Sequence, residues 1–284
     1  PPWAAPAARG GAGGGGRGGG GRGAGPPPPP AAVAAAAERY ALRGAALVGV
    51  IHESFVPGVR ALGVDPGRIR LVPNWTHVQG PTADRAATRA RLGWPPDTTV
   101  LLHSGNMGLK QGLDVLVDTA RLAGDVRVVL MGDGNQRDAL RARAEGLPNV
   151  DFVEPAAADE FTDVLAAADV LAVTQRASVL DMSVPSKLTS YFASGRPVIA
   201  SVAEEGGTAD EVRRSGAGVL VAPEDPAALL EALRKLTADP AAADALGAEG
   251  PKYVTRRLSR EAGLARFDGL LAEVLPDAQG SPRR

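Results

Sequence analysis

Hydrophobic and polar positions follow a repeating order from residue 98 to residue 239. Short apolar runs alternate with segments whose apolar residues recur at helical spacing, as Leu113, Leu116, Val117 and Ala120 do. Continuous apolar strands joined by helices predict a parallel sheet covered on both faces, so the expected fold class is α/β with a Rossmann-like domain. The apolar runs span residues 98–104, 126–132, 149–154, 170–175, 197–202 and 218–223, and the helical segments span residues 112–124, 159–168, 184–195 and 225–239.

The segments on either side of this repeat have weaker patterns. Pro57 and Gly58 are expected to break a short helix over residues 53–64, and residues 77–81 read as a linker. The other predicted elements are helices over residues 34–45, 83–93 and 258–275 and strands over residues 46–51 and 65–75.

The first 33 residues are rich in glycine, proline and alanine and are expected to be disordered, as is the tail over residues 276–284. Arg9, Arg17 and Arg22 among glycines leave open an RNA-binding segment. A second alternative is that this stretch comes from GC-rich DNA translated in the wrong frame.

Composition excludes several classes of function. A formal charge of −1 argues against a wide electrostatic grip on nucleic acid or anionic lipid. The chain has no cysteine, which suits a reducing cytoplasm, and no secretory signal or membrane-spanning stretch is recognised. His52, His77 and His103 are far apart in sequence, so we expect no shared metal site among them.

The loop after the first predicted strand of the repeat, SGNMGLKQG, has the composition of a phosphate-binding turn. Gly105 and Gly108 allow the backbone to approach a ligand, Lys110 adds a positive charge, and the next helix is expected to begin near Gly112 with free N–H groups. The loop matches neither the Walker pattern nor the dinucleotide pattern. The alternative is that this loop is only a turn with an exposed lysine and binds no phosphate.

Two further loops carry similar features. Gly132 follows a buried strand, although a simple turn at Asp133 is the slightly favoured explanation of that segment. Pro185 begins a predicted helix and places Ser186 and Lys187 near its amino end, where hydroxyl, ammonium and N–H groups can hold an anion. Because ligands bind beyond the carboxyl ends of parallel strands, the two basic loops indicate one polyanionic ligand between them.

Seven segments in order resemble the nucleotide-sugar-binding half of the family 4 glycosyltransferases, in the branch that builds exopolysaccharide, capsule and O-antigen. The resemblance covers residues 34–271 and implies the GT-B architecture, with two Rossmann-like domains facing across a cleft. It also implies transfer with retention of anomeric configuration and no metal or other cofactor. The segments are LVPNW, HSGNMGLKQGLDVLVDTA, VVLMGDGNQRDAL, NVDFVE, AAADVLAVTQ, VPSKLTSYFASGRPVIAS and GAGVLVAPEDPAALLEAL.

The resemblance assigns roles to individual residues. Lys110 and Lys187 would hold the diphosphate, and Val153 and Glu154 would hold the base with backbone groups. The candidate catalytic residues are Lys110, Lys187 and Asp181, and the candidate nucleotide-sugar-binding residues are Gly105, Asn106, Lys110, Gly132, Val153, Glu154, Ser186, Lys187 and Ser190.

Two departures from the family pattern concern charge. The family's paired glutamates are absent, and Met182 and Ser190 occupy their positions. We expect Asp181 to approach the sugar and Ser190 the ribose, with a helix cap and a surface residue as the alternatives. Asn106 stands where the family often has arginine, so the predicted phosphate-binding site has one positive charge fewer.

The resemblance also implies a domain organisation. Residues 34–80 correspond to a remnant of the N-terminal acceptor domain and the linker, residues 81–253 to the donor domain, and residues 254–275 to a helix that crosses back. The expected donor is a UDP- or GDP-linked sugar and the expected acceptor a glycan or lipid-linked glycan. The location is cytoplasmic, with peripheral attachment to the inner membrane face as an option. The alternatives are a nucleotide-sugar-binding module without turnover and a sugar-nucleotide 2-epimerase.

Overall fold

The computed structural model describes residues 30–76, 78–179 and 186–275. Its internal contacts divide the chain into two compact units, one of residues 1–48 with 56–70 and one of residues 49–55 with 71–284. The predictions for the glycine-rich tail, His77, Asp181, Met182 and the last nine residues lie outside the described residues.

The first unit contains the helices α1 (Pro30–Gly44) and α2 (Val56–Ala61) and a short 3-10 turn, Pro66–Arg68. Hydrogen bonds from arginine side chains to backbone carbonyl oxygens stabilise this unit. The Nε of Arg43 donates to the carbonyl oxygen of Leu62 at 3.0 Å, and Arg68 donates to those of Arg43 and Ala45 at 3.0 and 2.7 Å. Strands β1 (Val48–Val50) and β2 (Ile69–Leu71) form a two-stranded sheet.

The expected helix break at Pro57 and Gly58 is wrong. Both residues lie inside α2, after a 3-10 turn over Glu53–Phe55. Proline is tolerated in the first turn of a helix because the N–H that it lacks has no partner within the helix at that position.

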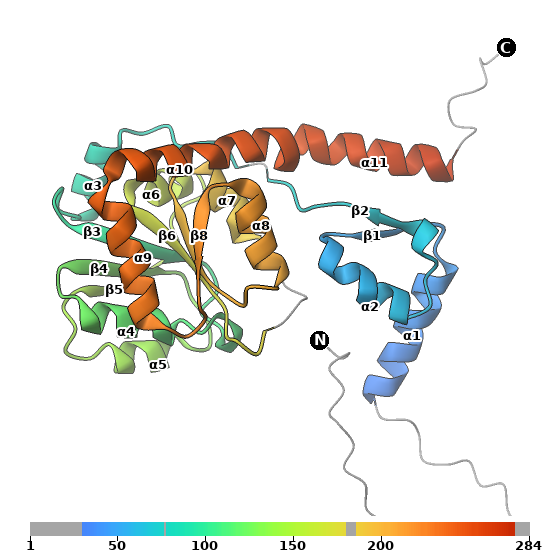
Figure 1. The fold of residues 1–284 in the computed structure, drawn as a ribbon, viewed down its shortest axis with the longest axis horizontal. Helices are drawn as coiled ribbons and strands as arrows, with labels where there is room; N and C mark the ends of the chain where they lie inside the picture. Colours follow the sequence, from blue (N-terminus) through green and yellow to red (C-terminus); the bar gives the residue numbers. More distant parts are fainter. Residues whose placement is uncertain (1–29, 77, 180–185, 276–284) are drawn as a thin grey trace, which may run out of the picture. The chain divides into compact units, whose positions relative to one another are not determined.

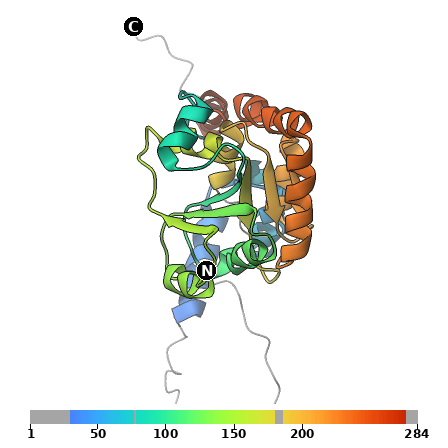
Figure 2. The same ribbon diagram turned by 90° about the vertical axis from the view of Figure 1, so that its left-hand side faces the viewer.

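The second unit contains the predicted parallel sheet. Six strands among the described residues pair in the order β5-β4-β3-β6-β7-β8, and every pairing is parallel. Helices flank the sheet on both sides (Figure 1; Figure 2). All six predicted strands are confirmed, as β3 (Thr99–Ser104), β4 (Val126–Met131), β5 (Val150–Val153), β6 (Val170–Thr174), β7 (Val198–Ser201) and β8 (Gly218–Val221).

Two apolar cores lie on the two faces of the sheet. Leu101 of β3 packs in the core formed with α4, α5 and α9, and its neighbour Leu102 packs in the core formed with α6, α7, α8 and α10. Both leucines are fully buried, and each such side chain stabilises the fold by about 1.5 to 3 kcal/mol. The helices are α3 (Arg85–Leu92), α4 (Asp114–Leu122), α5 (Arg137–Arg143), α6 (Phe161–Ala167), α7 (Lys187–Ala193), α8 (Gly207–Ser215), α9 (Pro226–Ala238), α10 (Pro240–Tyr253) and α11 (Arg260–Val274).

Glycines allow α10 to pack closely against the segment that contains α7. A Cβ at Gly250 would collide with the backbone of Phe192, and one at Gly247 would collide with the backbone at Gly195. The rings of Phe192 and Tyr253 also meet edge to face at 5.8 Å. These contacts hold α10 against the segment that contains α7.

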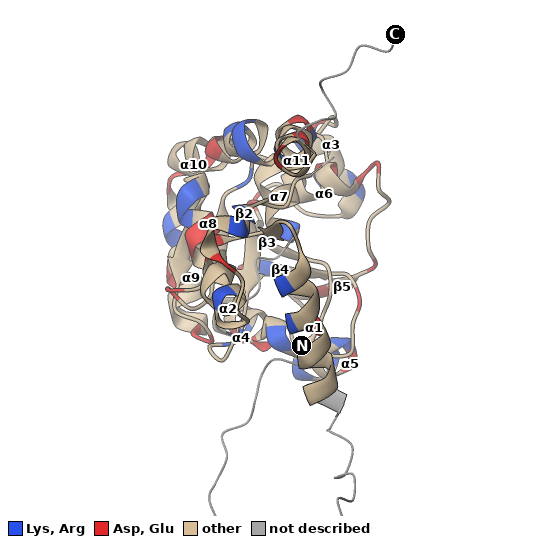
Figure 3. Ribbon diagram, turned by 90° about the vertical axis from the view of Figure 1, so that its right-hand side faces the viewer, with Lys and Arg blue, Asp and Glu red and all other residues tan. Residues whose placement is uncertain are grey.

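The C-terminal helix α11 contacts the segment that leads into the second unit. The ring of Trp75 meets that of Phe267 edge to face at 5.4 Å, and a Cβ at Gly263 would lie 2.6 Å from the Trp75 ring. No helix among the described residues has the length and apolar character needed to cross a membrane. In the view of Figure 3, basic and acidic residues are interspersed over the helices.

Candidate functional site

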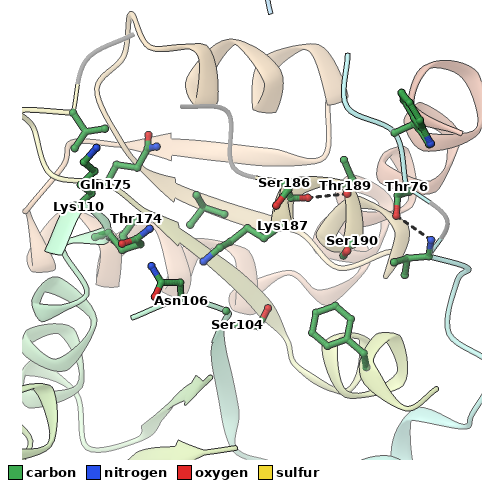
Figure 4. A pocket seen from close by; sticks show the side chains of 17 residues that line it. Thr76, Ser104, Asn106, Lys110, Thr174, Gln175, Ser186, Lys187, Thr189 and Ser190 are labelled. Carbon is green, nitrogen blue, oxygen red and sulfur yellow. Dashed lines mark hydrogen bonds between the residues drawn. The ribbon is translucent and has the colours of Figure 1, made fainter. Parts of the chain in front are cut away.

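A cavity of about 540 Å³ opens at the carboxyl ends of β3 and β6. These strands are neighbours in the sheet, and the strand order reverses between them, which is where ligands bind in open α/β sheets. Figure 4 shows the lining side chains. They are Trp75, Thr76, Val78, Ser104, Gly105, Asn106, Lys110, Gln111, Phe161, Val173, Thr174, Gln175, Val179, Ser186, Lys187, Thr189 and Ser190.

The glycine loop after β3 forms one wall of the cavity. Gly105 has φ of 110°, a conformation that favours glycine, and its N–H donates to the carbonyl oxygen of Met131 at 2.8 Å. Residues Leu109–Gln111 then form a 3-10 turn that carries Lys110. Helix α4 begins at Asp114, two residues later than expected, because Gly112 adopts a left-handed conformation with φ of 57°. The first residues of α4 therefore do not line the cavity.

Arg176 fixes the backbone on which Lys110 stands. Its backbone N–H donates to the carbonyl oxygen of Lys110, and its Nε donates to that of Leu109, both at 3.0 Å. The guanidinium also contacts carboxylate oxygens of Asp114 at 3.1 Å and Glu224 at 2.9 Å. The turn is held in place while the Lys110 side chain remains exposed.

Helix α7 forms the opposite wall and is hydrogen-bonded to β3 through Tyr191. The Tyr191 hydroxyl is fully buried and accepts a hydrogen bond from the Ser104 N–H at 2.7 Å. Burial raises the pKa of Tyr191 to about 12, so the hydroxyl stays protonated at physiological pH. This bond sets the position of Ser186, Lys187 and Ser190 relative to the glycine loop.

A lysine that lines the cavity contacts a fully buried histidine of β3. The Lys187 Nζ lies 3.1 Å from the Nε2 of His103, and Figure 4 shows the lysine extending from α7 toward Asn106. Burial lowers the pKa of Lys187 to about 7. Burial, and then the charge of Lys187, lower the pKa of His103 well below its usual value, so the imidazole is neutral.

Most of the sequence-predicted site residues lie together. Gly105, Asn106, Lys110, Ser186, Lys187 and Ser190 all line the cavity. Their roles toward a ligand stay predictions.

Three other predicted site residues lie outside the lining. A Cβ at Gly132 would collide with the carbonyl oxygen of Gly105, so Gly132 supports the glycine loop from beneath. The carbonyl oxygen of Val153 accepts a hydrogen bond from the Gly132 N–H at 3.0 Å, and the carboxylate of Glu154 pairs with Arg137. Asp181 lies outside the described residues.

Sequence reasoning missed several residues that shape the site. Tyr191 and His103 are the clearest, because both are fully buried and both bond across from α7 to β3. A histidine at the end of an apolar strand was the available signal for His103. Thr174 was also missed, and its hydroxyl donates to the carbonyl oxygen of Gln111 at 2.6 Å.

The charge of the cavity is one-sided. Among the described residues that line it, Lys110 and Lys187 are the charged side chains, and there is no carboxylate. The described part of the chain also contains no group of three or more His, Cys, Asp or Glu side chains that could hold a metal ion. A cavity with this lining has the chemistry of a site for an anionic ligand that also carries apolar and hydrogen-bonding groups.

The fold and the cavity together define a Rossmann-like α/β domain with a cavity lined by two lysines at the switch point of its sheet. The family described as Glycosyl transferases group 1 matches residues 98–239, which hold the whole sheet. The chain belongs to the group 1 glycosyl transferases.

Individual relatives agree with this family. The putative colanic acid biosynthesis glycosyl transferase WcaI of Escherichia coli is 30% identical over 81% of this chain. Sucrose-phosphate synthase from Thermosynechococcus elongatus is 25% identical and has a TM-score of 0.74 over 87% of this chain. Anabaena HepE in complex with UDP is 20% identical and has a TM-score of 0.69 over 84% of this chain, which shows a shared fold.

The chain spans only part of these proteins. It covers 58% of the length of WcaI, 63% of the sucrose-phosphate synthase chain and 65% of the HepE chain.

Proposed function

We propose that the cavity binds a nucleoside diphosphate sugar and that this chain is the donor-binding part of a retaining glycosyltransferase. The observation that carries the proposal is a cavity of about 540 Å³ at the sheet's switch point that is lined by two lysines and no carboxylate among the described residues. That volume falls in the range of about 300 to 1,000 Å³ typical of small-molecule sites. The UDP complex of HepE supports the choice of ligand class.

Different lining residues would contact different parts of the proposed ligand. Lys110 and Lys187 neutralise the diphosphate, and Gly105 lets the backbone approach it. Their positive charge favours departure of the diphosphate as the bond to the sugar breaks, which is electrostatic stabilisation of a developing anion without a metal or other cofactor. Ser186 and Ser190 supply hydroxyl groups for the sugar or the ribose.

The acceptor is proposed on the ground of the relatives. WcaI is named for colanic acid biosynthesis, so we propose a glycan or a lipid-linked glycan as the acceptor. Attachment of the acceptor to a lipid would bring the enzyme to the inner membrane face. Because the chain covers 58% of WcaI, acceptor binding is assigned to no described residue.

Calorimetric titration with UDP, GDP and ADP tests the donor site. We expect one of the three to bind with a dissociation constant in the micromolar range and the other two to bind at least tenfold more weakly, since a base pocket discriminates by about 1.4 kcal/mol or more. A Lys110→Ala, Lys187→Ala double variant serves as the negative control. If none of the three nucleotides binds, the donor-site proposal is wrong.

A second function is favoured by one observation. Ser190 lines the cavity at a position where the family resemblance calls for a glutamate, so the chain has one carboxylate fewer near the sugar. A module that binds the nucleotide sugar without turnover fits this change. Incubation with UDP-glucose, or with the GDP-linked sugar if GDP binds, and chromatography of the released nucleotide distinguishes the two. Release above the double variant's rate supports the enzyme, and tight binding without release supports the module.

A further inference from the structure

His103 is a fully buried polar side chain in contact with Lys187 of this site, and it has no role in the proposed function so far. It is fully buried at the end of β3, and its Nε2 lies 3.1 Å from the Nζ of Lys187. The two residues are 84 positions apart in sequence and come from β3 and α7. A buried histidine against a lysine places two nominal cations in contact, which is unfavourable unless one of them is neutral.

The backbone decides which ring nitrogen carries the hydrogen. The Nδ1 of His103 lies 3.3 Å from the carbonyl oxygen of Ala172, which can only accept a hydrogen bond. The backbone of Asn106 is a second hydrogen-bond partner of the ring. We assign the hydrogen of the neutral ring to Nδ1, which leaves Nε2 as the acceptor for Lys187. Lys187 has only donors when it is protonated, so the amine donates to Nε2.

The hydrogen bond between Lys187 and His103 places the lysine amine beside the glycine loop. The Lys187 Nζ and Cε both lie 3.6 Å from the position that a Cβ on Gly105 would occupy. The amine is thus held against the glycine loop. Without an acceptor at this depth, a flexible lysine side chain would lose the fixed geometry.

We propose that His103 is a positioning residue for the donor site: its Nε2 accepts a hydrogen bond from Lys187 and holds the amine beside Gly105, where it meets the diphosphate of a nucleoside diphosphate. The identity of the ligand rests on the proposed function. The pairing of His103 with Lys187 rests on the geometry of the chain alone.

The pairing couples nucleotide binding to proton uptake. The groups that face Lys187 are His103 from β3, Lys110 from the glycine loop, and uncharged polar residues of β6 and α7, with no carboxylate among the described lining. Burial already lowers the pKa of Lys187 to about 7, so the empty site is only partly protonated at neutral pH. A phosphate supplies the missing negative charge, and the amine takes up a proton on binding.

Trace labelling of amines with acetic anhydride, read by mass spectrometry across pH, tests the pairing without any nucleotide. The chain has four lysines, and the exposed Lys235 and Lys252 act as internal references. We expect Lys187 to label with a midpoint near pH 7. His103→Leu removes the acceptor that stabilises the ammonium and lowers the midpoint by about one pH unit, a tenfold change in ionisation constant, and His103→Gln restores most of it.

His52→Leu is the matched control, because His52 is also buried but bonds to Ser54 and Asp210 instead. It should leave the Lys187 profile unchanged. A Lys187 midpoint equal to that of the exposed lysines, or one that does not respond to His103→Leu, overturns the proposal.

The wild-type chain provides a second measurement in case His103→Leu does not fold. Nitrogen-15 NMR of the three histidines reports which ring nitrogen carries the hydrogen. We expect His103 to be the Nδ1–H form between pH 6 and pH 9. The Nε2–H form would overturn the proposal, because Nε2 would then be unable to accept from Lys187.

The last measurement uses UDP. At pH 7 we expect His103→Leu to weaken UDP binding about tenfold and His103→Gln less than threefold. Calorimetry in two buffers of different ionisation enthalpy should show proton uptake by the wild type. If the wild type binds none of UDP, GDP and ADP while the labelling and NMR results hold, the assignment of the ligand as a nucleoside diphosphate is wrong and the pairing of His103 with Lys187 stands. UDP binding that is tight and equal in all variants overturns the positioning role.

Discussion

At the scale of single residues, the two lysines of the cavity differ in what holds them. Lys110 is exposed, and its position comes from the backbone that Arg176 fixes beneath it. Lys187 is partly buried, and its amine contacts His103 directly. An exposed cation is screened by water and salt, whereas a desolvated one interacts more strongly with a ligand charge. The two side chains should therefore differ in both energy and pH dependence.

Substitution of either lysine by alanine should weaken binding of a nucleoside diphosphate. For Lys110→Ala and Lys187→Ala we expect losses within about 1.5 to 3 kcal/mol, the range for a hydrogen bond to a charged group, with the larger loss for the desolvated Lys187. Lys235→Ala, at an exposed position on α9, should change binding by less than about 0.5 kcal/mol. Calorimetric titration with UDP measures the binding free energies. An unchanged affinity in Lys110→Ala would favour the interpretation of the glycine loop as a simple turn.

The buried Lys187 should also make stability depend on pH. The pKa of this lysine is about 7 in the folded chain against a usual value of 10.5. Between those values the unfolded chain binds a proton that the folded chain has released, so the free energy of unfolding rises with pH. We expect a rise of about 1 to 2 kcal/mol between pH 7.5 and pH 9.5 in the wild type and a flatter curve in Lys187→Met. Urea denaturation at several pH values measures it, and parallel curves would contradict the burial of the amine.

At the scale of elements, the site depends on contacts between segments that are distant in sequence. The Tyr191 hydroxyl joins α7 to β3, and the glycines of α10 let that helix press on the segment around Phe192. Helix α11 packs on Trp75, which lines the cavity. Each contact transmits the position of a helix to one wall of the cavity, so substitutions outside the lining should reach the ligand.

Two glycines of α11 should respond in opposite ways to alanine. A Cβ at Gly263 would lie 2.6 Å from the Trp75 ring, so Gly263→Ala should destabilise α11 by about 1 to 3 kcal/mol through overpacking. A Cβ at Gly269 meets nothing within 4 Å, so Gly269→Ala should stabilise the same helix by up to about 1 kcal/mol. Amide hydrogen exchange of residues 260–274 reads both effects. Equal behaviour of the two variants would show that Trp75 does not pack on α11.

The sequence predicted the sheet well because its signal is local. Each strand is a short apolar run, and glycine, proline or a neighbouring helical pattern marks the ends of most of these runs. The start of α4 was misplaced by two residues because the left-handed conformation of Gly112 interrupts the segment that was expected to be helical.

The candidate site was predictable only in part because its interactions are long-range. Gly105, Lys110 and Lys187 stood out by residue type and by position after a strand or at a helix start. His103 and Tyr191 did not, since each partner is more than 80 residues away and no local pattern marks the pair. Gly132 was predicted as a binding residue because it follows a buried strand, but its contact is with Gly105 and not with the cavity.

At the scale of the whole molecule, a nearly neutral chain holds a locally positive cavity. The formal charge is −1, and basic and acidic residues are interspersed along the ribbon in Figure 3. The attraction for an anion therefore depends on two lysines at one place and has little contribution from the field of the whole protein. Binding should stabilise the unit that contains the cavity.

Saturation with UDP should raise the free energy of unfolding of the second unit. At a hundred times the dissociation constant, a ligand that binds only the folded state adds about 2.7 kcal/mol. Amide exchange in β3 and β6, which meet at the cavity, should slow accordingly. The Lys110→Ala, Lys187→Ala variant at the same UDP concentration should show no change, and a change there would place the nucleotide elsewhere.

The order of the strands also makes the sheet divisible. Strands β3, β4 and β5 are consecutive in the chain, as are β6, β7 and β8, and the register between the two groups joins Leu101 to Val170 and Leu102 to Leu171. A chain cut between residues 155 and 159 would yield two fragments, each with three paired strands, that share the cavity between them. Nucleotide binding would then favour association of the two fragments, and binding of the nucleotide would report that the fragments have associated.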